Sequence, residues 1–221
     1  MVSWSSGKDS AWTLHILRQQ NEFEIRGLLT TLNIEFDRVA MHGTRRALLE
    51  AQAKAVGLPL IQVPLPWPCS NEIYEAAMKK AVEQMLSDGV SVIAFGDLFL
   101  QEIRAYREKQ LEGSGLTPVF PLWGKPTPCL AREMIGAGLR ANIACLDPAK
   151  MPEEFAGQEL TLELLERLPA SVDLCGENGE FHTVVHAGPM FDAPLQLCAG
   201  VSVQRSGFIY TDFLVGSNVP V

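Results

Sequence analysis

Residues 2–15 read VSWSSGKDSAWTLH: a short apolar start, a polar loop with one glycine, and then the beginning of a helical pattern. We predict a strand at Val2–Trp4 and a helix at Ser10–Gln20. A loop between a strand and a helix presents successive backbone N–H groups, and the helix adds the positive end of its dipole. The stretch therefore predicts a strand–loop–helix unit that can hold an anion.

The same alternation continues through the first half of the chain. Further strands are expected at Glu24–Leu32, Pro59–Pro64 and Ser91–Phe95, and further helices at Thr44–Val56, Asn71–Leu86 and Leu98–Gln110. Such a series predicts an α/β fold with a parallel sheet and helices on both of its faces. Ligands of these sheets bind at the carboxyl ends of the strands, where residues 5–10 and Gly96-Asp97 are both expected.

The amino-acid composition changes after residue 110. Residues 111–128 are dense in glycine and proline and are expected to join two domains. Helices are expected at Cys129–Ala137 and Thr161–Leu168, a strand at Ala141–Leu146, and a strand-rich end that closes in a frayed tail at 216–221. We predict a first domain at 1–112 and a smaller α+β domain at 113–221.

Composition limits the classes of function. The 221 residues are 47% hydrophobic and 20% charged, as in a globular protein, and no apolar run is long enough to span a bilayer. The five cysteines are scattered without a C-x-x-C pair, so we expect a cytoplasmic protein without a disulfide framework. The net charge of −8 makes nucleic acid an unlikely partner. The lack of a long apolar run predicts no membrane association, while a homodimer stays open.

Two interpretations of the loop compete at this point. Ser5, Ser6, Asp9 and Ser10 are all good helix-capping residues, so an ordinary strand-to-helix turn would explain them. The loop is not a Walker A sequence, because that pattern needs a glycine where Val2 stands. Its position directly after the first strand favours phosphate binding.

The loop S-S-G-K-D-S resembles the S-G-G-x-D-S loop of the PP-loop ATP pyrophosphatases. Ser5, Gly7, Asp9 and Ser10 meet that pattern, and Ser6 replaces its first glycine, which costs backbone freedom if the position needs positive φ. FGDLFLQEIRAYRE (95–108), TPVFPLWGKPT (117–127) and CGENGEFHTVV (175–185) resemble the diphthine–ammonia ligase family, and more closely its bacterial relatives of unassigned substrate.

The resemblance implies a Rossmann-like domain of the HUP type, which binds a nucleotide, and a smaller substrate-binding domain. It implies cleavage of ATP to AMP and pyrophosphate with Mg²⁺, adenylation of a carboxylate or other small-molecule acceptor, and amide formation with ammonia. The nucleotide-binding residues expected are Ser5, Ser6, Gly7, Lys8, Asp9, Ser10, Thr30, His42, Gly96 and Asp97. The catalytic residues expected are Lys8, Asp9, Arg104, Glu177, Glu180 and His182, and no metal ligands are assigned.

Several of these residues also have simpler interpretations. Arg104 would bind an anion, or would pair with Glu108 one helical turn away. Asp97 would orient magnesium or ribose, or would cap the helix expected at Leu98. His42 would shape the nucleotide pocket, or would pack or cap a helix. On the helix 98–110, the apolar set Phe99, Ile103 and Tyr106 is expected to face the core.

Asn178-Gly179 predicts a two-residue β-hairpin turn. In that hairpin Glu177 would face Glu180, and Cys175 would face His182. The two carboxylates would then bind a cationic group or ammonia, with His182 as a proton carrier, or would be a solvated hairpin tip.

Three functions are therefore weighed. The first is an AMP-forming, ATP-dependent amide ligase. The second is an adenine nucleotide alpha hydrolase without an acceptor, and the third is a non-catalytic ATP-binding module, towards which Ser6 in place of glycine is a mild pointer.

Overall fold

The computed structural model describes residues 1–40 and 42–216, so the tail expected at 216–221 lies, except for Gly216, outside the described residues. Five parallel strands form the first sheet, in the spatial order β4, β2, β1, β5, β6. Their bounds are β1 Val2–Ser3, β2 Leu28–Asn33, β4 Leu60–Leu65, β5 Val92–Ala94 and β6 Thr117–Val119. The two-residue strand β3, Arg38–Val39, runs antiparallel to the end of β2. The predicted α/β class is confirmed, with a mostly parallel sheet.

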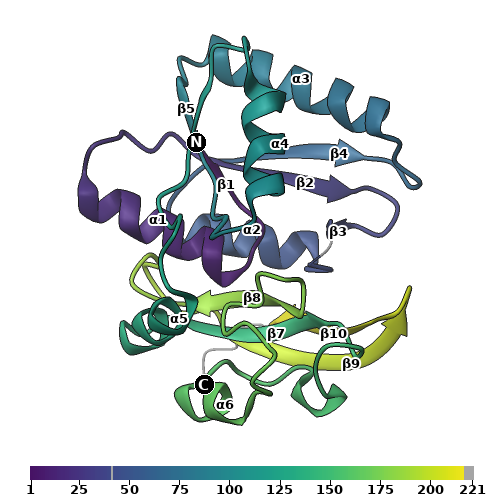
Figure 1. Cartoon of the computed structure of the whole chain (residues 1–221). Helices are drawn as coiled ribbons and strands as arrows, with labels where there is room; N and C mark the ends of the chain where they lie inside the picture. The colour runs from purple at the N-terminus through teal and green to yellow at the C-terminus, as the bar shows by residue number, and fades with distance from the viewer. Residues whose placement is uncertain (41, 217–221) are drawn as a thin grey trace.

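Four helices cover the two faces of this sheet (Figure 1). They are α1 Lys8–Gln20, α2 Arg46–Ala55, α3 Asn71–Ser87 and α4 Gln101–Leu111. The chain moves outward from β1 through β2 to β4, and then returns to β5 on the other side of β1. The strand order therefore reverses between β1 and β5, which is where open α/β sheets bind their ligands.

The second sheet is antiparallel, in the order β8, β7, β10, β9. Its strands are β7 Arg140–Leu146, β8 Phe181–Ala187, β9 Leu197–Arg205 and β10 Phe208–Val215, accompanied by α5 Thr127–Gly136, a 3-10 turn at Glu153–Phe155 and α6 Leu162–Arg167. Strand β8 contacts α1, and β10 contacts α2. The second sheet thus lies against the helices of one face of the first sheet (Figure 1).

One hydrophobic core runs through both sheets. It joins Trp12 and Leu14 of α1 to Ile143 of β7 and to Phe181 and Val185 of β8, all nearly inaccessible to solvent. A second cluster, which includes Met85 and Ile93, fills the space under α3 and α4. The boundary at residues 112/113 remains a prediction, and β6 extends the first sheet past it.

Local signals explain where several helices begin and end. Ser70 caps α3 by accepting a hydrogen bond from the N–H of Ile73, and Thr161 caps α6 in the same way. Gly57 follows α2 with φ of +67°, as expected for a glycine that ends a helix.

Two expectations for the segment 98–128 are wrong. The helix α4 begins at Gln101 rather than Leu98, and Phe99, Ile103 and Tyr106 are 38–45% exposed instead of facing the core. Helical spacing identifies an apolar stripe, but it does not say whether another element covers that stripe. The glycine- and proline-rich joining region also contains a strand, β6, which is short and includes Pro118.

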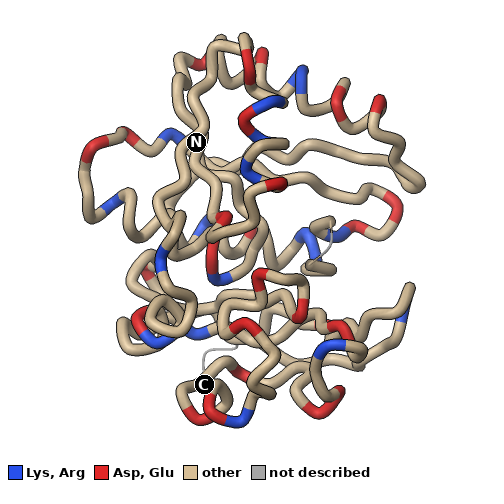
Figure 2. The backbone as a smooth tube through the Cα atoms, in the orientation of Figure 1, with Lys and Arg blue, Asp and Glu red and all other residues tan. Residues whose placement is uncertain are grey.

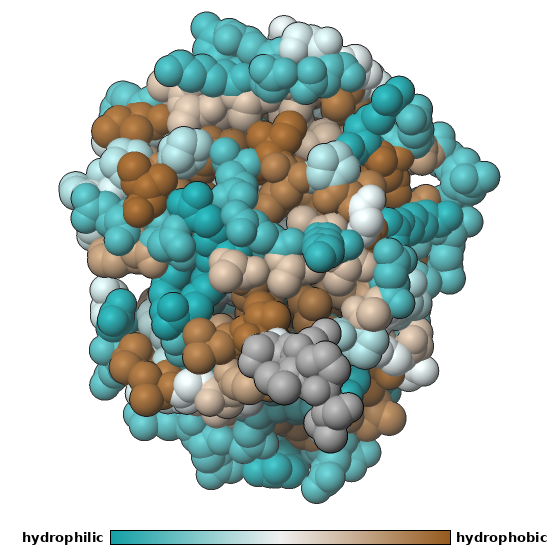
Figure 3. All heavy atoms as spheres, turned by 180° about the vertical axis from the view of Figure 1, so that it is seen from behind, coloured by the Kyte–Doolittle hydropathy of each residue, from teal (hydrophilic) through white to brown (hydrophobic). Residues whose placement is uncertain are grey.

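The surface carries intermixed charge. Basic and acidic residues are interspersed in the view of Figure 2, and no basic band crosses it. On the rear face, hydrophobic residues gather in patches separated by hydrophilic ones (Figure 3). In the part of the chain that the structure describes, no helix combines the length and apolar character needed to cross a membrane.

Candidate active site

The Ser5–Ser10 loop lies at the carboxyl end of β1 and leads directly into α1. Its hydroxyl groups hold its shape: Ser10 donates to the carbonyl of Gly7 at 2.9 Å, and the Ser5 hydroxyl lies 3.3 Å from that of Ser10. Gly7 has extended backbone geometry and precedes the first helical residue. The sequence positions that match the phosphate-loop pattern therefore form one compact turn.

Ser6 has φ of +71°, in the left-handed region that glycine tolerates best. The condition stated in the sequence analysis, that this position needs positive φ, is therefore met. Its hydroxyl donates to Thr44 at 2.7 Å, and the residue is fully buried. This hydrogen bond offsets part of the left-handed strain, which is about 1–2 kcal/mol for a residue with a side chain.

The side chain of Gln52, in α2, holds the loop in place through hydrogen bonds. Its amide nitrogen donates to the carbonyl of Ser6 at 3.0 Å and to that of Val185 at 2.7 Å, and its oxygen accepts from the indole of Trp4. The side chain is inaccessible to solvent, so these bonds form in a low-dielectric interior. One amide thus ties together β1, the loop and β8.

Lys8 is buried, and its ammonium donates to both oxygens of Asp9, at 2.8 and 2.9 Å, and to the carbonyl of Cys175. Burial alone would lower the pKa of Lys8, but the attraction of Asp9 and of Glu177 outweighs it and holds the pKa above its usual value. Lys8 therefore carries a positive charge beside the loop.

The segment that precedes and begins β8 covers the loop. Thr183 accepts from the backbone N–H of Lys8 at 3.0 Å, and the N–H of Val185 donates to the carbonyl of Ser6 at 2.9 Å. Glu177 reaches across to the first sheet, where it accepts from the N–H of Leu98 at 2.8 Å. The turn before β8 and the start of β8 therefore lie against the residues that follow β1 and β5.

The prediction of a β-hairpin at Asn178-Gly179 is wrong. No strand leads directly into the turn among the described residues. A type I′ turn also needs positive φ at both central residues, whereas positive φ occurs here at Gly176 and Gly179. Asp173 organises the turn instead: its carboxylate accepts from the N–H groups of Cys175 and Glu177. Cys175 consequently does not pair with His182, which lies opposite Cys145.

Glu177 and Glu180 do not face each other. Glu180 is 3% exposed, and one of its oxygens accepts from the N–H of Asp173 at 2.9 Å, while the other has no partner among the described residues. Glu177 is half-buried, and burial raises the pKa of its carboxyl to about 7, with repulsion from Asp9 and Asp97 acting in the same direction. Of the two, Glu177 is the one that accepts a hydrogen bond from the segment after β5, at Leu98.

His42 and His182 form a pair beside the loop. Their ring centroids are 4.6 Å apart, and a carbon atom of the His42 ring lies 3.0 Å from where a Cβ on Gly7 would stand. Burial lowers the pKa of His42 to about 3 and that of His182 to about 4, and the charge of Lys8 adds to both effects. Both imidazoles are therefore neutral at neutral pH.

Gly96 brings β5 against the loop. A Cβ at Gly96 would lie 2.9 Å from the carbonyl carbon of Asp9 and 3.1 Å from the nitrogen of Ser10. Close packing therefore requires glycine here, whatever its part in ligand binding. Thr30 lies in the middle of β2 rather than at its end, and its buried hydroxyl donates to the carbonyl of Trp4.

Two expected residues are engaged elsewhere. Asp97 forms an ion pair with Arg107 at 2.6 Å and does not cap a helix, because α4 starts later. Arg104 pairs with Glu108 at 2.8 Å, and its guanidinium carbon lies 4.8 Å from the ring centroids of both Phe120 and Trp123. The simpler interpretation of Arg104 describes its contacts.

Four residues of the site had not been singled out: Thr44, Gln52, Asp173 and Thr183. Each acts through contacts with residues 38 or more positions away, except for the turn around Asp173. A buried glutamine inside an otherwise apolar helical face was the one available signal. Among the described residues, no group of three His, Cys, Asp or Glu side chains is placed to hold a metal ion.

Comparison with known proteins agrees with this architecture. The sequence model of the diphthamide synthase N-terminal domain matches residues 1–118, and that of the diphthamide synthase C-terminal domain matches residues 127–210. The chain belongs to the diphthamide synthase family. A relative from Danio rerio described as diphthine–ammonia ligase is 32% identical over 143 residues, which cover 62% of this chain and 54% of the relative. The chain thus spans about half the length of this curated family member.

Proposed function

We propose that this diphthamide synthase family member cleaves ATP between the α and β phosphates, adenylates a carboxylate and converts it into an amide with ammonia. The observation that carries the proposal is the Ser5–Ser10 loop at the point where the strand order reverses, with Gly96 against its backbone. The curated relative is a diphthine–ammonia ligase, which favours the same chemistry.

The steps balance as follows. A carboxylate oxygen of the acceptor attacks the α phosphorus, the bond to the β phosphate breaks, and pyrophosphate leaves. Ammonia then attacks the acyl carbon, AMP leaves, and a proton is released. The loop N–H groups would bind the departing pyrophosphate, and Lys8 would neutralise its charge.

Lys8 and Asp9 must exchange partners for this to occur. The Lys8 ammonium now binds Asp9 and the carbonyl of Cys175, so a phosphate oxygen would have to replace one of these acceptors. Magnesium carried by the phosphates needs only one or two protein carboxylates, and Asp9, which is 27% exposed, is the carboxylate of the loop. When bound, that ion would neutralise phosphate charge.

The acceptor side is assigned to the segment that covers the loop. Glu177 would hold or deprotonate the ammonium ion, since its raised pKa lets it exchange a proton near neutral pH. His182, neutral and next to His42, would carry a proton, and Glu180 would position the turn through Asp173. Arg104 keeps the weakest assignment, because its contacts are with Glu108 and two aromatic rings.

The test is incubation of the whole chain with ATP, Mg²⁺ and ammonium, with and without a panel of small carboxylates, followed by separation of the nucleotides. AMP and pyrophosphate whose rate rises with both ammonium and a carboxylate are expected. ADP and phosphate as products would contradict the proposal. AMP formation in water alone, without stimulation, would assign the hydrolase instead, and tight ATP binding without products would assign the non-catalytic module. Asp9→Ala and Ser10→Ala should abolish AMP formation.

A further inference from the structure

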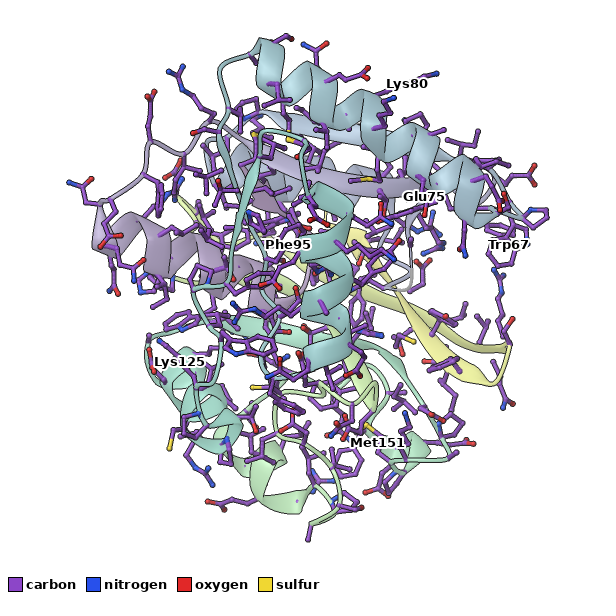
Figure 4. The ribbon with its side chains drawn as sticks, turned by 45° about the horizontal axis from the view of Figure 1, so that its top comes forward. Trp67, Glu75, Lys80, Phe95, Lys125 and Met151 are labelled. Carbon is purple, nitrogen blue, oxygen red and sulfur yellow. The ribbon has the colours of Figure 1, made fainter. Side chains whose placement is uncertain are left out.

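A cavity of about 270 Å³ lies between α3 and α4, over strand β5. Helices α3 and α4, which border it, lie on the side of the first sheet that the second sheet does not cover (Figure 1). Glu75 of α3 and Phe95 at the end of β5, both of which line it, are labelled in Figure 4. This cavity takes no part in the site described above.

The floor of the cavity is apolar and well ordered by packing. It consists of five buried side chains from three elements: Val82, Met85, Ile93, Phe95 and Leu111, each at most 9% exposed. An apolar void of this kind loses the dispersion contacts that its lining would otherwise make. A ligand with an apolar body would restore these contacts.

The rim carries charges of both signs. Glu75 and Lys79 come from α3, while Arg107 and Gln110 come from α4. The amide of Gln110 donates to Glu75 at 3.2 Å across the mouth, so the two helices meet there through a polar contact. A cation on the ligand can take the place of that amide on the Glu75 carboxylate.

Arg107 is held in place for an anion. Its guanidinium carbon lies 4.5 Å from the ring centroid of Phe95, and its Nε and Nη2 donate to Asp97. Among the residues that the structure describes, Nη1 has no acceptor and is available to a ligand. A guanidinium fixed by stacking and by one carboxylate loses little side-chain entropy when it binds a second.

We propose that the α3–α4 cavity binds a zwitterionic α-amino acid with a medium-sized apolar side chain. The side chain lies on Met85, Ile93 and Phe95, the carboxylate meets Arg107 and Lys79, and the ammonium meets Glu75. The volume suits a residue such as leucine, methionine or phenylalanine, and it is small for a nucleotide, since ligand sites of drug size reach about 300–1,000 Å³. This proposal does not depend on ATP cleavage.

The experiment is isothermal titration of the whole chain, without ATP, with L-leucine, L-methionine and L-phenylalanine. Each amino acid has two comparators, the amine that lacks its carboxylate and the acid that lacks its amine; for leucine these are isoamylamine and 4-methylpentanoate. At least one amino acid should saturate the protein, and its two truncated analogues should bind at least tenfold more weakly. Absence of saturable binding up to about 10 mM, the weak end of specific affinities, would overturn the proposal. Equal binding of leucine and its analogues would also overturn it.

Variants locate the binding. Glu75→Gln removes the charge from an exposed rim position and should weaken binding about tenfold, or about 1.4 kcal/mol. Glu83→Gln, at an exposed position of the same helix that does not line the cavity, is the matched control and should bind as wild type. Val82→Phe fills the floor and should abolish binding while ATP affinity stays unchanged. If Val82→Phe fails to fold, Glu75→Gln still decides, because binding unaltered by that change would contradict the site.

Discussion

Oε1 of Glu177 accepts a hydrogen bond from the backbone N–H of Leu98 at 2.8 Å. A carboxylate from the turn before β8 is thereby held at the segment that follows β5. The same turn supplies the Cys175 carbonyl that Lys8 binds. The two contacts make the second sheet a cover for the Ser5–Ser10 loop, and they give the cover a titratable group.

Glu177→Gln should change how stability depends on pH. Burial raises the pKa of Glu177 to about 7 in the folded state, above the ordinary 4.5, so the folded chain holds this proton more tightly than the unfolded chain. The resulting stabilisation is complete below pH 4.5 and is lost as the pH rises through 7. Urea unfolding at pH 5 and pH 8 should therefore show the variant gaining stability relative to wild type at the higher pH. Parallel pH profiles for the two proteins would contradict this, and the exposed Glu83→Gln change should leave the profile unaltered.

His182→Gln should change how stability depends on pH below pH 6.5. Burial, with the charge of Lys8, lowers the pKa of His182 to about 4. Below pH 6.5 the unfolded chain therefore binds a proton at His182 that the folded chain does not bind. Wild-type stability attributable to His182 is therefore lost as the pH falls from 6.5 towards 4. Thermal unfolding between pH 4.5 and 7.5 should give a flatter acid limb for the variant. An acid limb as steep as that of wild type would show that His182 is not buried as described.

Ser6→Gly and Ser6→Ala should behave differently. Glycine relieves left-handed strain of about 1–2 kcal/mol but gives up the hydrogen bond to Thr44, worth about 0.5–1.5 kcal/mol, so its stability should stay within about 1 kcal/mol of wild type. Alanine keeps the strain and loses the bond, and it should be less stable by about 1–2 kcal/mol. ATP affinity should be kept or improved in Ser6→Gly. Equal destabilisation by both changes in urea titrations would argue against the left-handed geometry.

Gly96→Ala should damage the loop from outside it. The new Cβ would stand 2.9 Å from the carbonyl carbon of Asp9, where backbone cannot yield easily, at a cost of about 1–3 kcal/mol. ATP affinity, measured by titration, should fall with stability because the loop must shift. Gly136→Ala is the matched control: nothing lies within 4 Å of its Cβ position, and it sits at the end of helix α5, so it should be neutral or slightly stabilising. Normal ATP binding in Gly96→Ala would separate this glycine from the loop's function.

Much of the first half of the fold follows from sequence pattern. Continuous apolar strands such as residues 91–95 and strand–loop–helix units repeat at regular spacing, and the positions of α1, α3 and β5 differ from expectation by at most two residues at each end. The hydrophobic patterns of these elements reflect their burial, because helices cover a parallel sheet on both faces.

The turn at residues 173–180 could not be predicted in the same way. Asn178-Gly179 favours a hairpin only if strands flank it, but the Asp173 carboxylate binds two N–H groups and folds the chain into successive turns. Similarly, Gln52 is a polar residue on an otherwise apolar helical face, but its partners Ser6 and Val185 cannot be identified from the local sequence. These residues act through partners distant in sequence, and local preference carries no information about such contacts.

The exposure of Ile103 and Tyr106 could not be predicted either, because it depends on whether elements distant in sequence cover this face of α4. Their spacing marks one face of α4, yet both side chains stay partly exposed, and Tyr106 lines the cavity between α3 and α4. Pattern alone cannot distinguish a face that is packed from one that waits for a ligand.

The core that runs from Trp12 and Leu14 to Phe181 and Val185 has a consequence for how the chain melts. The two sequence models of the family divide the chain near residue 120, but neither part keeps its apolar surface covered without the other. The protein should therefore unfold in one calorimetric transition, and either half produced alone should aggregate. The cooperative unit of this protein is larger than either domain that homology recognises.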